Sequence, residues 1–242
     1  ISTDTLIETI HFNGNETPKL LAQKALRVNL SDLAAMGADP EFYSLALSIP
    51  KRNADNFLRS FTKGLSIDQN TFHIKLIGGD LTSSPKLISI TINIIGSVPL
   101  NKSITRNGGM EGDLIYVTGK LGLSNIGLLH LNEKNNQFSE SQRKYVLPEP
   151  RVKFAGLIRN YVTSMIDISD GFLQDASHLA QGSNTEFVID LKKIPLPKIK
   201  SLSKKRILKS ALTGGDDYEL LFTSPPHFES NLKIIAKKNE IK

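Results

Sequence analysis

The sequence predicts an α/β protein of the α+β type, with mixed or antiparallel sheets in two domains. Strand-like and helix-like segments alternate in two successive sets along the 242 residues, a length that by itself leaves one large or two modest domains open. A turn-rich stretch over 101–112 separates the two sets. Between residues 87 and 95 isoleucines alternate with polar residues, which is typical of a half-buried strand in a mixed or antiparallel sheet.

The first set of elements runs from the N-terminus to about residue 95. Pro18 opens a helical segment that Gly37 ends. A short apolar strand stops at Gly78-Gly79-Asp80, which places Asp80 at the carboxyl end of a strand. We expect helices at 18–36 and 53–65, and strands at 2–12, 43–49, 73–77 and 87–95.

The second set begins after a domain boundary that we place between residues 107 and 108. Its loop Gly119–Gly122 either cradles a phosphate at a helix N-terminus or allows close strand–helix packing. A Walker A motif is excluded, because Gly119-Lys120 lacks both the earlier glycine and the following Ser or Thr. We expect strands at 114–118, 164–168, 186–191 and 218–223, and helices at 123–131, 150–161 and 172–180.

Composition narrows the function classes. The chain has no cysteine, so any metal must be held by oxygen or imidazole. The net charge of +6 comes from scattered basic residues, with only a short cluster at Lys204–Lys209, which disfavours nucleic-acid binding. Neither a signal peptide nor a membrane span is recognisable, so we expect a cytoplasmic protein. The chain opens at Ile1 within a strand-like segment, and we expect a preceding segment.

Asp32 is the most informative single residue. It falls on the same helical stripe as apolar residues, and its neighbours one turn away carry no positive charge. An unpaired carboxylate there would cost several kcal/mol if buried, so it needs a metal or a distant partner. The alternative is a shorter helix in which Asp32 caps a new turn after Ser31. The apolar residues of the stripe are Leu21, Ala25, Val28 and Ala35.

Further acidic clusters lie at the ends of predicted strands. Ser169 or Asp170 could simply cap the next helix, but that would leave Asp167 without a role. Each of the other clusters could be a solvated turn. Taken together, they favour several Mg²⁺ ions held jointly by carboxylates and phosphates. The clusters are Ser2-Thr3-Asp4, Gly78-Gly79-Asp80, Asp167 to Gly171, and Asp216-Asp217.

In order and spacing, the motifs of the chain resemble the thiamine-monophosphate kinase family over nearly the whole length. The blocks Asn29–Ala38 and Ile166–Gly171 are the most specific. The others are Ser2–Leu6 with His11-Phe12, Gly78–Asp80, Gly112-Asp113 with Val117–Gly119, Pro148–Arg151 and Gly214–Leu220.

The resemblance implies the two-domain fold shared with aminoimidazole-ribonucleotide synthetase, ATP as co-substrate, thiamine monophosphate as acceptor, and a homodimer formed through the N-terminal domains. Residues 1–107 would form the ATP- and magnesium-binding dimerisation domain, and 108–242 a C-terminally incomplete domain. Implied magnesium ligands are Ser2, Thr3, Asp4, Asp32, Asp80, Asp167 and Asp170. Implied ATP contacts are Gly79, Asp80, Arg106 and Ser169, and implied substrate contacts are His11 and Asp216. No general base is expected.

The chain departs from the family pattern in two ways. Asp216 stands where the family usually has glutamate, which shortens a substrate contact by one methylene. The aspartate-rich segment at the start of family members and their C-terminal substrate-stacking aromatic are not in these residues. Two alternatives therefore stay open: another ATP-using synthetase of the same fold, or a non-catalytic nucleotide-binding protein.

Overall fold

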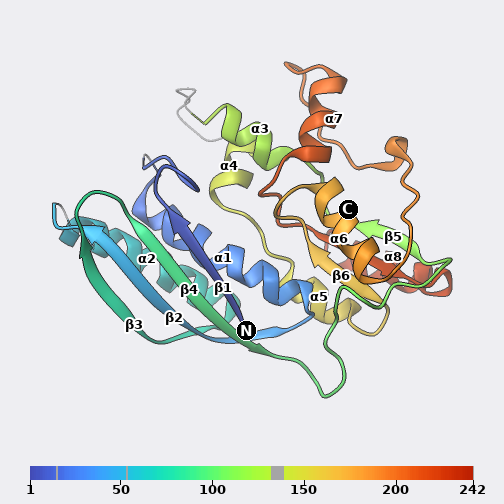
Figure 1. Cartoon of the computed structure of the whole chain (residues 1–242), viewed down its shortest axis with the longest axis horizontal. Helices are drawn as coiled ribbons and strands as arrows, with labels where there is room; N and C mark the ends of the chain where they lie inside the picture. Colours follow the sequence, from blue (N-terminus) through green and yellow to red (C-terminus); the bar gives the residue numbers. More distant parts are fainter. Residues whose placement is uncertain (15, 53, 132–138, 242) are drawn as a thin grey trace. The chain divides into compact units, whose positions relative to one another are not determined.

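The computed structural model describes residues 1–242 except 15, 53, 132–138 and 242. It divides into two compact units (Figure 1). The first comprises residues 1–33 and 39–97, and the second residues 34–38 and 98–242. Within the described residues, no helix combines the length and hydrophobicity that crossing a bilayer requires.

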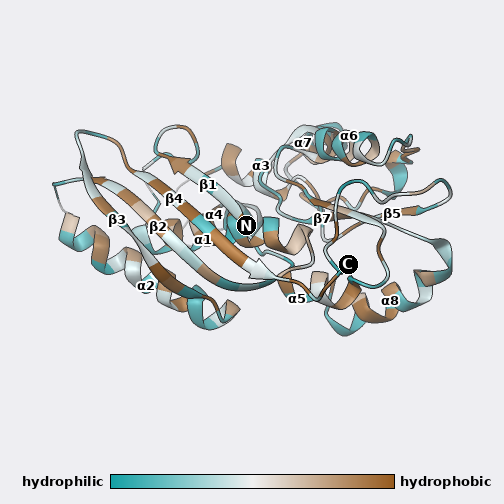
Figure 2. Cartoon of the chain, turned by 60° about the horizontal axis from the view of Figure 1, so that its bottom comes forward, coloured by the Kyte–Doolittle hydropathy of each residue, from teal (hydrophilic) through white to brown (hydrophobic). Residues whose placement is uncertain are grey.

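The first unit is a four-stranded sheet with helices on one face. Its order is β1-β4-β2-β3, with β3 parallel to β2 and the other pairs antiparallel, as the predicted mixed sheet requires. Figures 1 and 2 show both helices on the same side of the sheet. The strands are β1 (Ser2–Ile7), β2 (Asp39–Pro50), β3 (Lys75–Ser84) and β4 (Ser89–Ser97), and the helices are α1 (Pro18–Ala35) and α2 (Ala54–Phe72).

The predicted alternation in β4 is confirmed. Ile90, Ile92 and Ile94 are almost completely buried against the helices, whereas Thr91 and Asn93 face the open side. Strand β1 is shorter than predicted and ends at Ile7. Beyond it the backbone turns at Thr9, whose φ is 71° and whose N–H donates to the carbonyl of Phe12.

The prediction that a strand stops at Gly78-Gly79-Asp80 is wrong. Strand β3 runs through all three residues to Ser84, so Asp80 lies in the middle of a strand. Gly79 pairs with Leu45 of β2, and a Cβ at Gly79 would lie 1.9 Å from the carbonyl oxygen of Leu45. The glycine therefore permits close strand pairing, where the sequence suggested a turn.

The second unit contains a smaller sheet of order β5-β7-β6 in which β7 is antiparallel to both neighbours. Figure 2 shows α6 and α7 on one face of this sheet and α8 on the other. The strands are β5 (Leu114–Val117), β6 (Ser164–Asp167) and β7 (Leu220–Ser224). The helices are α3 (Leu123–Leu129), α4 (Glu140–Val146), α5 (Val152–Ile158), α6 (Phe172–Gly182), α7 (Lys204–Thr213) and α8 (Glu229–Lys238), with 3₁₀ turns η1 (Leu191–Lys193) and η2 (Pro226–Phe228).

The core of the second unit lies between the sheet and the helices α6 and α7. Ile166, Phe172 and Leu221 contribute to it from three different elements. The predicted strand at 186–191 is wrong, since no strand is formed there in the described structure. Its alternating residues lie along an extended segment, but a strand also requires a backbone partner, which sequence alternation cannot supply.

Candidate functional site

In the first unit, two of the predicted magnesium ligands lie side by side. Asp32 on α1 accepts a short hydrogen bond from the hydroxyl of Ser2 on β1. The backbone N–H of Asp4 donates to Oδ1 of Asn29, one turn before Asp32 on the same helix, at 3.1 Å. Helix α1 is continuous to Ala35, so the alternative of a new turn capped by Asp32 is wrong. The structure brings Ser2, Asp4 and Asp32 together.

The electrostatics of this pair suit a cation. Burial and the nearby charge of Asp32 raise the pKa of Asp4 to about 6. Two carboxylates that disfavour each other's charge are stabilised when a divalent cation binds between them, and Mg²⁺ prefers such oxygen ligands. In the part of the chain that the structure describes, no group of three or more His, Asp or Glu side chains is placed to hold a metal. Asp4 and Asp32 are thus two adjacent carboxylates without a third His, Asp or Glu beside them in the described residues.

Thr3 and His11, which the resemblance also implied, lie differently. The hydroxyl of Thr3 donates to Oδ1 of Asn93 at 2.7 Å on the open face of the sheet, away from α1. Exposed His11 accepts the N–H of Ile7 at 3.0 Å through Nδ1, which leaves the proton of a neutral ring on Nε2. Within the first unit, Thr3 is directed away from the Asp4–Asp32 pair.

Asp80 does not join the pair within the first unit. The register aligns it with Ala46, Thr91 and Thr5, and the Thr5 and Thr91 hydroxyls meet at 2.9 Å on the exposed face. Asp80 is thus on the open face and three strands away from β1, or about 14 Å at the usual strand spacing.

In the second unit, the loop after β6 carries another group of predicted residues. Asp167 ends the strand and is buried, Ser169 is partly buried, and Asp170 is exposed, where it accepts from Nε2 of Gln174 at 3.0 Å. The residue that caps α6 is Gly171, with φ 122° and no side-chain hydrogen bond. The reading of Ser169 or Asp170 as a simple helix cap is therefore wrong.

The loop is joined by backbone hydrogen bonds to the segment before β7. The N–H of Asp216 donates to the carbonyl of Ser169 at 2.9 Å, and that of Tyr218 to Ile168 at 2.8 Å. The Tyr218 hydroxyl donates to Oδ1 of Asp216 at 3.1 Å. The structure thus brings Asp216, predicted to contact substrate, beside Ser169, predicted to contact ATP.

Arg106 lies in the loop before β5, beside the C-terminal end of α6. Its carbonyl accepts the hydroxyl of Ser183 at 2.9 Å, at the C-terminal end of that helix, while its side chain is exposed. Because α6 has 11 residues and a helix rises 1.5 Å per residue, the backbone of Arg106 is about 16 Å from the loop of Ser169. A single extended ligand would be needed to contact both.

The loop Gly119–Gly122 is occupied by protein side chains. A Cβ at Gly119 would lie 2.3 Å from Oε1 of the buried Glu219, and Asp217 accepts the N–H of Gly122 at 2.6 Å. These contacts favour close packing over a phosphate cradle. Burial raises the pKa of Asp217 to about 7, although the backbone N–H groups of Gly122 and Ser124 that bind its carboxylate act to lower that pKa.

Sequence reasoning missed two buried carboxylates of the second unit, Asp175 and Glu219. The carboxylate of Glu219 accepts hydrogen bonds from the side chains of Lys144 and Arg151 at 2.6 to 2.8 Å. It also accepts one from the hydroxyl of Thr118 at 2.6 Å. The signal was an acidic residue flanked by Tyr218 and the apolar strand β7. Such a residue must be paired if it is buried.

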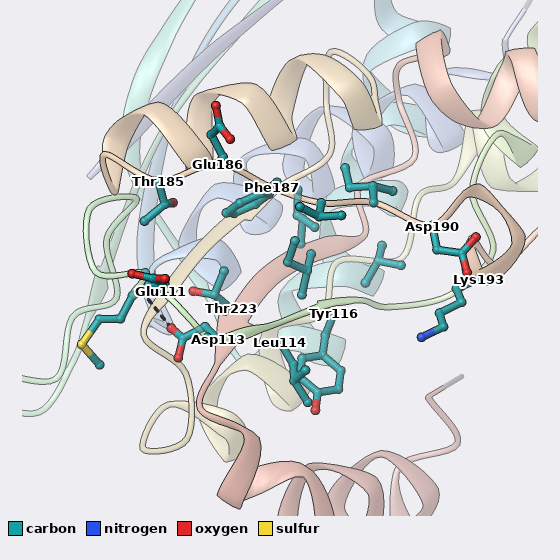
Figure 3. Close-up of a pocket in the computed structure, with 18 of the residues that line it drawn as sticks. Glu111, Asp113, Leu114, Tyr116, Thr185, Glu186, Phe187, Asp190, Lys193 and Thr223 are labelled. Atoms are coloured by element: carbon teal, nitrogen blue, oxygen red, sulfur yellow. Dashed lines mark hydrogen bonds between the residues drawn. The ribbon is translucent and has the colours of Figure 1, made fainter.

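A hollow of about 800 Å³ lies beside the free edge of β5 in the second unit. Figure 3 shows the segment with Thr185, Phe187 and Asp190 along one side and β5 with Leu114 and Tyr116 along the other. None of the predicted site residues is among its lining residues in the described structure. Within the second unit, the hollow therefore does not include the side chains of Asp167, Ser169, Asp170 or Asp216, although Phe172, directly after the acidic loop, lines it.

Comparison with known proteins covers both units. Residues 1–98 match the family described as AIR synthase related protein, N-terminal domain, and residues 110–241 match its C-terminal domain. The chain is 40% identical to a thiamine-monophosphate kinase of Buchnera aphidicola, over the whole chain and 76% of that protein.

Solved structures give the same result. The thiamine-monophosphate kinase of Stenotrophomonas maltophilia superposes with a TM-score of 0.93 at 31% identity, covering all of this chain and 79% of that one. AaThiL in complex with AMPPCP and TMP superposes with a TM-score of 0.86 at 29% identity, and the match covers 93% of this chain and 75% of that one. The predicted two-domain fold is confirmed, and the chain belongs to the thiamine-monophosphate kinase family.

Proposed function

We propose that this protein transfers the γ-phosphoryl group of ATP to thiamine monophosphate in a magnesium-dependent reaction that yields thiamine diphosphate and ADP. The single observation that carries the chemistry is the pair Asp4 and Asp32, two adjacent carboxylates with the hydroxyl of Ser2. Phosphoryl transfer requires such oxygen ligands to hold metal ions against phosphates. Membership of the thiamine-monophosphate kinase family supports the choice of acceptor.

The proposed site divides its residues by role. Ser2, Asp4 and Asp32 hold Mg²⁺ in the first unit, and the remaining proposed ligands are Thr3, Asp80, Asp167 and Asp170. Gly79, Asp80, Arg106 and Ser169 contact ATP, while His11 and Asp216 contact thiamine monophosphate. Bound Mg²⁺ would neutralise phosphate charge as the two anionic substrates approach.

No residue needs to act as a general base. The second pKa of a phosphate monoester is near 6, so the attacking oxygen of thiamine monophosphate is largely deprotonated at neutral pH. The remaining task of the protein is to align two anions and offset their repulsion. Arg106 contributes positive charge to this task, and transfer is direct, without a phosphoenzyme. We propose that the reaction takes place in the cytoplasm.

We further propose that the protein is a homodimer formed through the first unit. Strand β3 is an edge strand of ten residues, and Leu76, Ile77 and Leu81 on it are exposed. Phe42 and Ile95 are also exposed on the helix-free face of this sheet. Long apolar edge strands are normally covered, and a second copy of the chain has the matching surface.

A dimer would also give Asp80 a role. Within one copy Asp80 is on the open face, opposite the face on which Asp4 meets α1. A second copy packed on the open face would turn its own open-face residues, its Asp80 included, towards this Asp80, whereas its Asp4–Asp32 pair would stay on the helix face. Asp80 therefore acts as a ligand in the proposed site only if the dimer forms.

The test is a titration of the full-length protein with ATP and MgCl₂, with and without thiamine monophosphate, in which ADP is measured. A kinase forms ADP only when thiamine monophosphate is present. ATP binding without ADP formation would indicate a non-catalytic nucleotide-binding protein. ADP formation at the same rate with and without thiamine monophosphate would indicate another ATP-using enzyme of the same fold.

A further inference from the structure

One buried carboxylate holds the backbone of the loop between β6 and α6. Asp175 lies in the first turn of α6 and is 2% exposed. Its Oδ2 accepts the backbone N–H groups of Ser169, Asp170 and Gly171, each at 3.1 Å. Three consecutive peptide groups are therefore oriented by a single atom, and the loop backbone has little freedom to rotate.

The opposite side of the loop is fixed as well. The carbonyl of Ser169 accepts the N–H of Asp216, and that of Ile168 accepts the N–H of Tyr218. Gly215 packs so closely that a Cβ there would lie 2.5 Å from the carbonyl oxygen of Ser169. With N–H groups bound on one side and carbonyls on the other, the side chains of Ser169 and Asp170 are not needed to hold the loop backbone, and that of Asp170 accepts only Nε2 of Gln174, an exposed contact, among the hydrogen bonds described.

Because of Asp175, the side chains of Ser169 and Asp170 are not needed to cap helix α6. A helix usually begins with a Ser, Thr, Asp or Asn whose side chain binds the first N–H groups. Here the capping position is Gly171, which has no side chain to do so. The carboxylate four residues into the helix reaches back and binds the loop N–H groups instead, so neither Ser169 nor Asp170 is used as a cap.

We propose that Asp175 is a positioning residue for the nucleotide and magnesium site, because it holds the loop in the backbone conformation that presents Ser169 and Asp170 together. The inference rests on the proposed function, which assigns Ser169 to ATP and Asp170 to Mg²⁺. Asp175 itself touches neither ligand, since its carboxylate is buried under the loop. It acts only through the backbone that it orients.

The test compares Asp175→Ala and Asp175→Asn in the full-length protein. Alanine removes the acceptor of all three N–H groups, whereas asparagine keeps an oxygen of the same reach without the charge. We expect the affinity for AMPPCP with MgCl₂, measured by calorimetry, to fall about tenfold or more in Asp175→Ala, since ordering even one residue's backbone has a cost of that size. The affinity of Asp175→Asn for AMPPCP should lie between that of Asp175→Ala and that of the unmodified protein.

A matched control separates positioning from loss of stability. The hydroxyl of Ser203 accepts the N–H of Arg206 at the start of α7, so Ser203→Ala also removes a side chain bound to a backbone N–H group in this unit. It should lower Tm by about 2–4 °C and leave nucleotide affinity unchanged. All variants are assayed well below their Tm. Amide hydrogen exchange should show lost protection at Ser169, Asp170 and Gly171 in the Asp175 variants only.

The outcomes are distinguishable. If both Asp175 variants are folded and bind AMPPCP and Mg²⁺ as tightly as the unmodified protein, Asp175 serves stability alone and the inference is wrong. If Asp175→Ala does not fold, the asparagine variant decides in the same way. If the unmodified protein forms no ADP with thiamine monophosphate, the proposed function fails, whatever the variants do.

Discussion

The replacement of Glu219 by glutamine gives the sharpest test of how the second unit is held together. The Glu219 side chain is 1% exposed and lies between Lys144 and Arg151. Its Oε1 accepts Nζ of Lys144 at 2.6 Å and Nη2 of Arg151 at 2.8 Å, and Oε2 accepts Nε of Arg151 at 2.7 Å. Glu219→Gln keeps the size of the side chain but removes the charge, and turns an amide N–H₂ towards one of these cations.

The size of the effect follows from burial. Removing one member of a buried ion pair costs about 3–5 kcal/mol, because the partner charge is left without compensation. The side chains of Lys144 and Arg151 are 12% and 13% exposed, so they keep limited access to water. We therefore expect the lower end, about 3 kcal/mol, which corresponds to a fall in Tm of about 6–12 °C for a chain of this size.

The assay is thermal unfolding followed by circular dichroism at pH 7, with Glu140→Gln as the matched control. Glu140 pairs with Lys120 at 3.3 Å, but its side chain is 71% exposed, and exposed pairs contribute little. The control should shift Tm by no more than about 2 °C. A Glu219→Gln variant that melts within 2 °C of the unmodified protein would refute the reasoning about the buried cluster.

The Tm difference between the Glu219→Gln variant and the unmodified protein should also depend on pH. Burial alone would raise the pKa of Glu219, but the Lys144 ammonium and the Arg151 guanidinium outweigh it and hold that pKa below its ordinary value of 4.5. A carboxyl with a lowered pKa in the folded state stabilises fully above its unfolded value and loses this contribution as pH falls below it. The Tm difference between the two proteins should therefore narrow below about pH 4.5.

Three further predictions concern the first unit and the proposed magnesium ion. Asp32→Asn should abolish magnesium-dependent ADP formation while Tm stays close to the unmodified value, and most activity surviving would exclude Asp32 as a ligand. Gly79→Ala should destabilise the protein by about 1–3 kcal/mol in urea unfolding because its Cβ would overlap the carbonyl of Leu45, whereas Gly78→Ala, with nothing within 4 Å, should be within about 0.5 kcal/mol. Chelation by EDTA should stop ADP formation and added MgCl₂ should restore it; full activity in EDTA would argue against the metal.

The elements that the sequence predicted well are those whose pattern is local. The alternating isoleucines in β4 record burial on one face, and the structure shows that burial. Helix α1 also forms as predicted, but it is buried on nearly all sides, since Gln23, Lys24 and Asn29 are buried as well as its apolar residues. Strand β3 was misjudged because Gly78-Gly79 is a turn signal by composition. Its extended form depends on pairing with β2, which the sequence does not display.

Three short helices, α4, α7 and α8, were missed. Helices α7 and α8 are rich in lysine and other polar residues, so they contain few apolar residues, although those few do lie on one face of each helix. The capping box of Ser139 with Gln142 and the cap of Ser203 were the available signals. Conversely, 186–191 has strand alternation without a paired neighbour in the described structure.

The candidate site was predictable as a set of residues and less so as an arrangement. Asp32 in an apolar row required a metal or a distant partner, and the structure places the hydroxyl of Ser2 and the carboxylate of Asp4 next to it. The position of Asp80 on the opposite face depends on strand register, and the role of Asp175 depends on a loop folding back on its own helix. Neither follows from residue spacing.

The most direct test of the central claim follows the phosphoryl group itself. The full-length protein is incubated with [γ-³²P]ATP, MgCl₂ and thiamine monophosphate, and the labelled products are separated after an acid quench and, in parallel, after denaturation at neutral pH. We expect the label in thiamine diphosphate and none on the protein. Label that remains in ATP, or appears only in inorganic phosphate or on the protein, would contradict direct transfer to thiamine monophosphate.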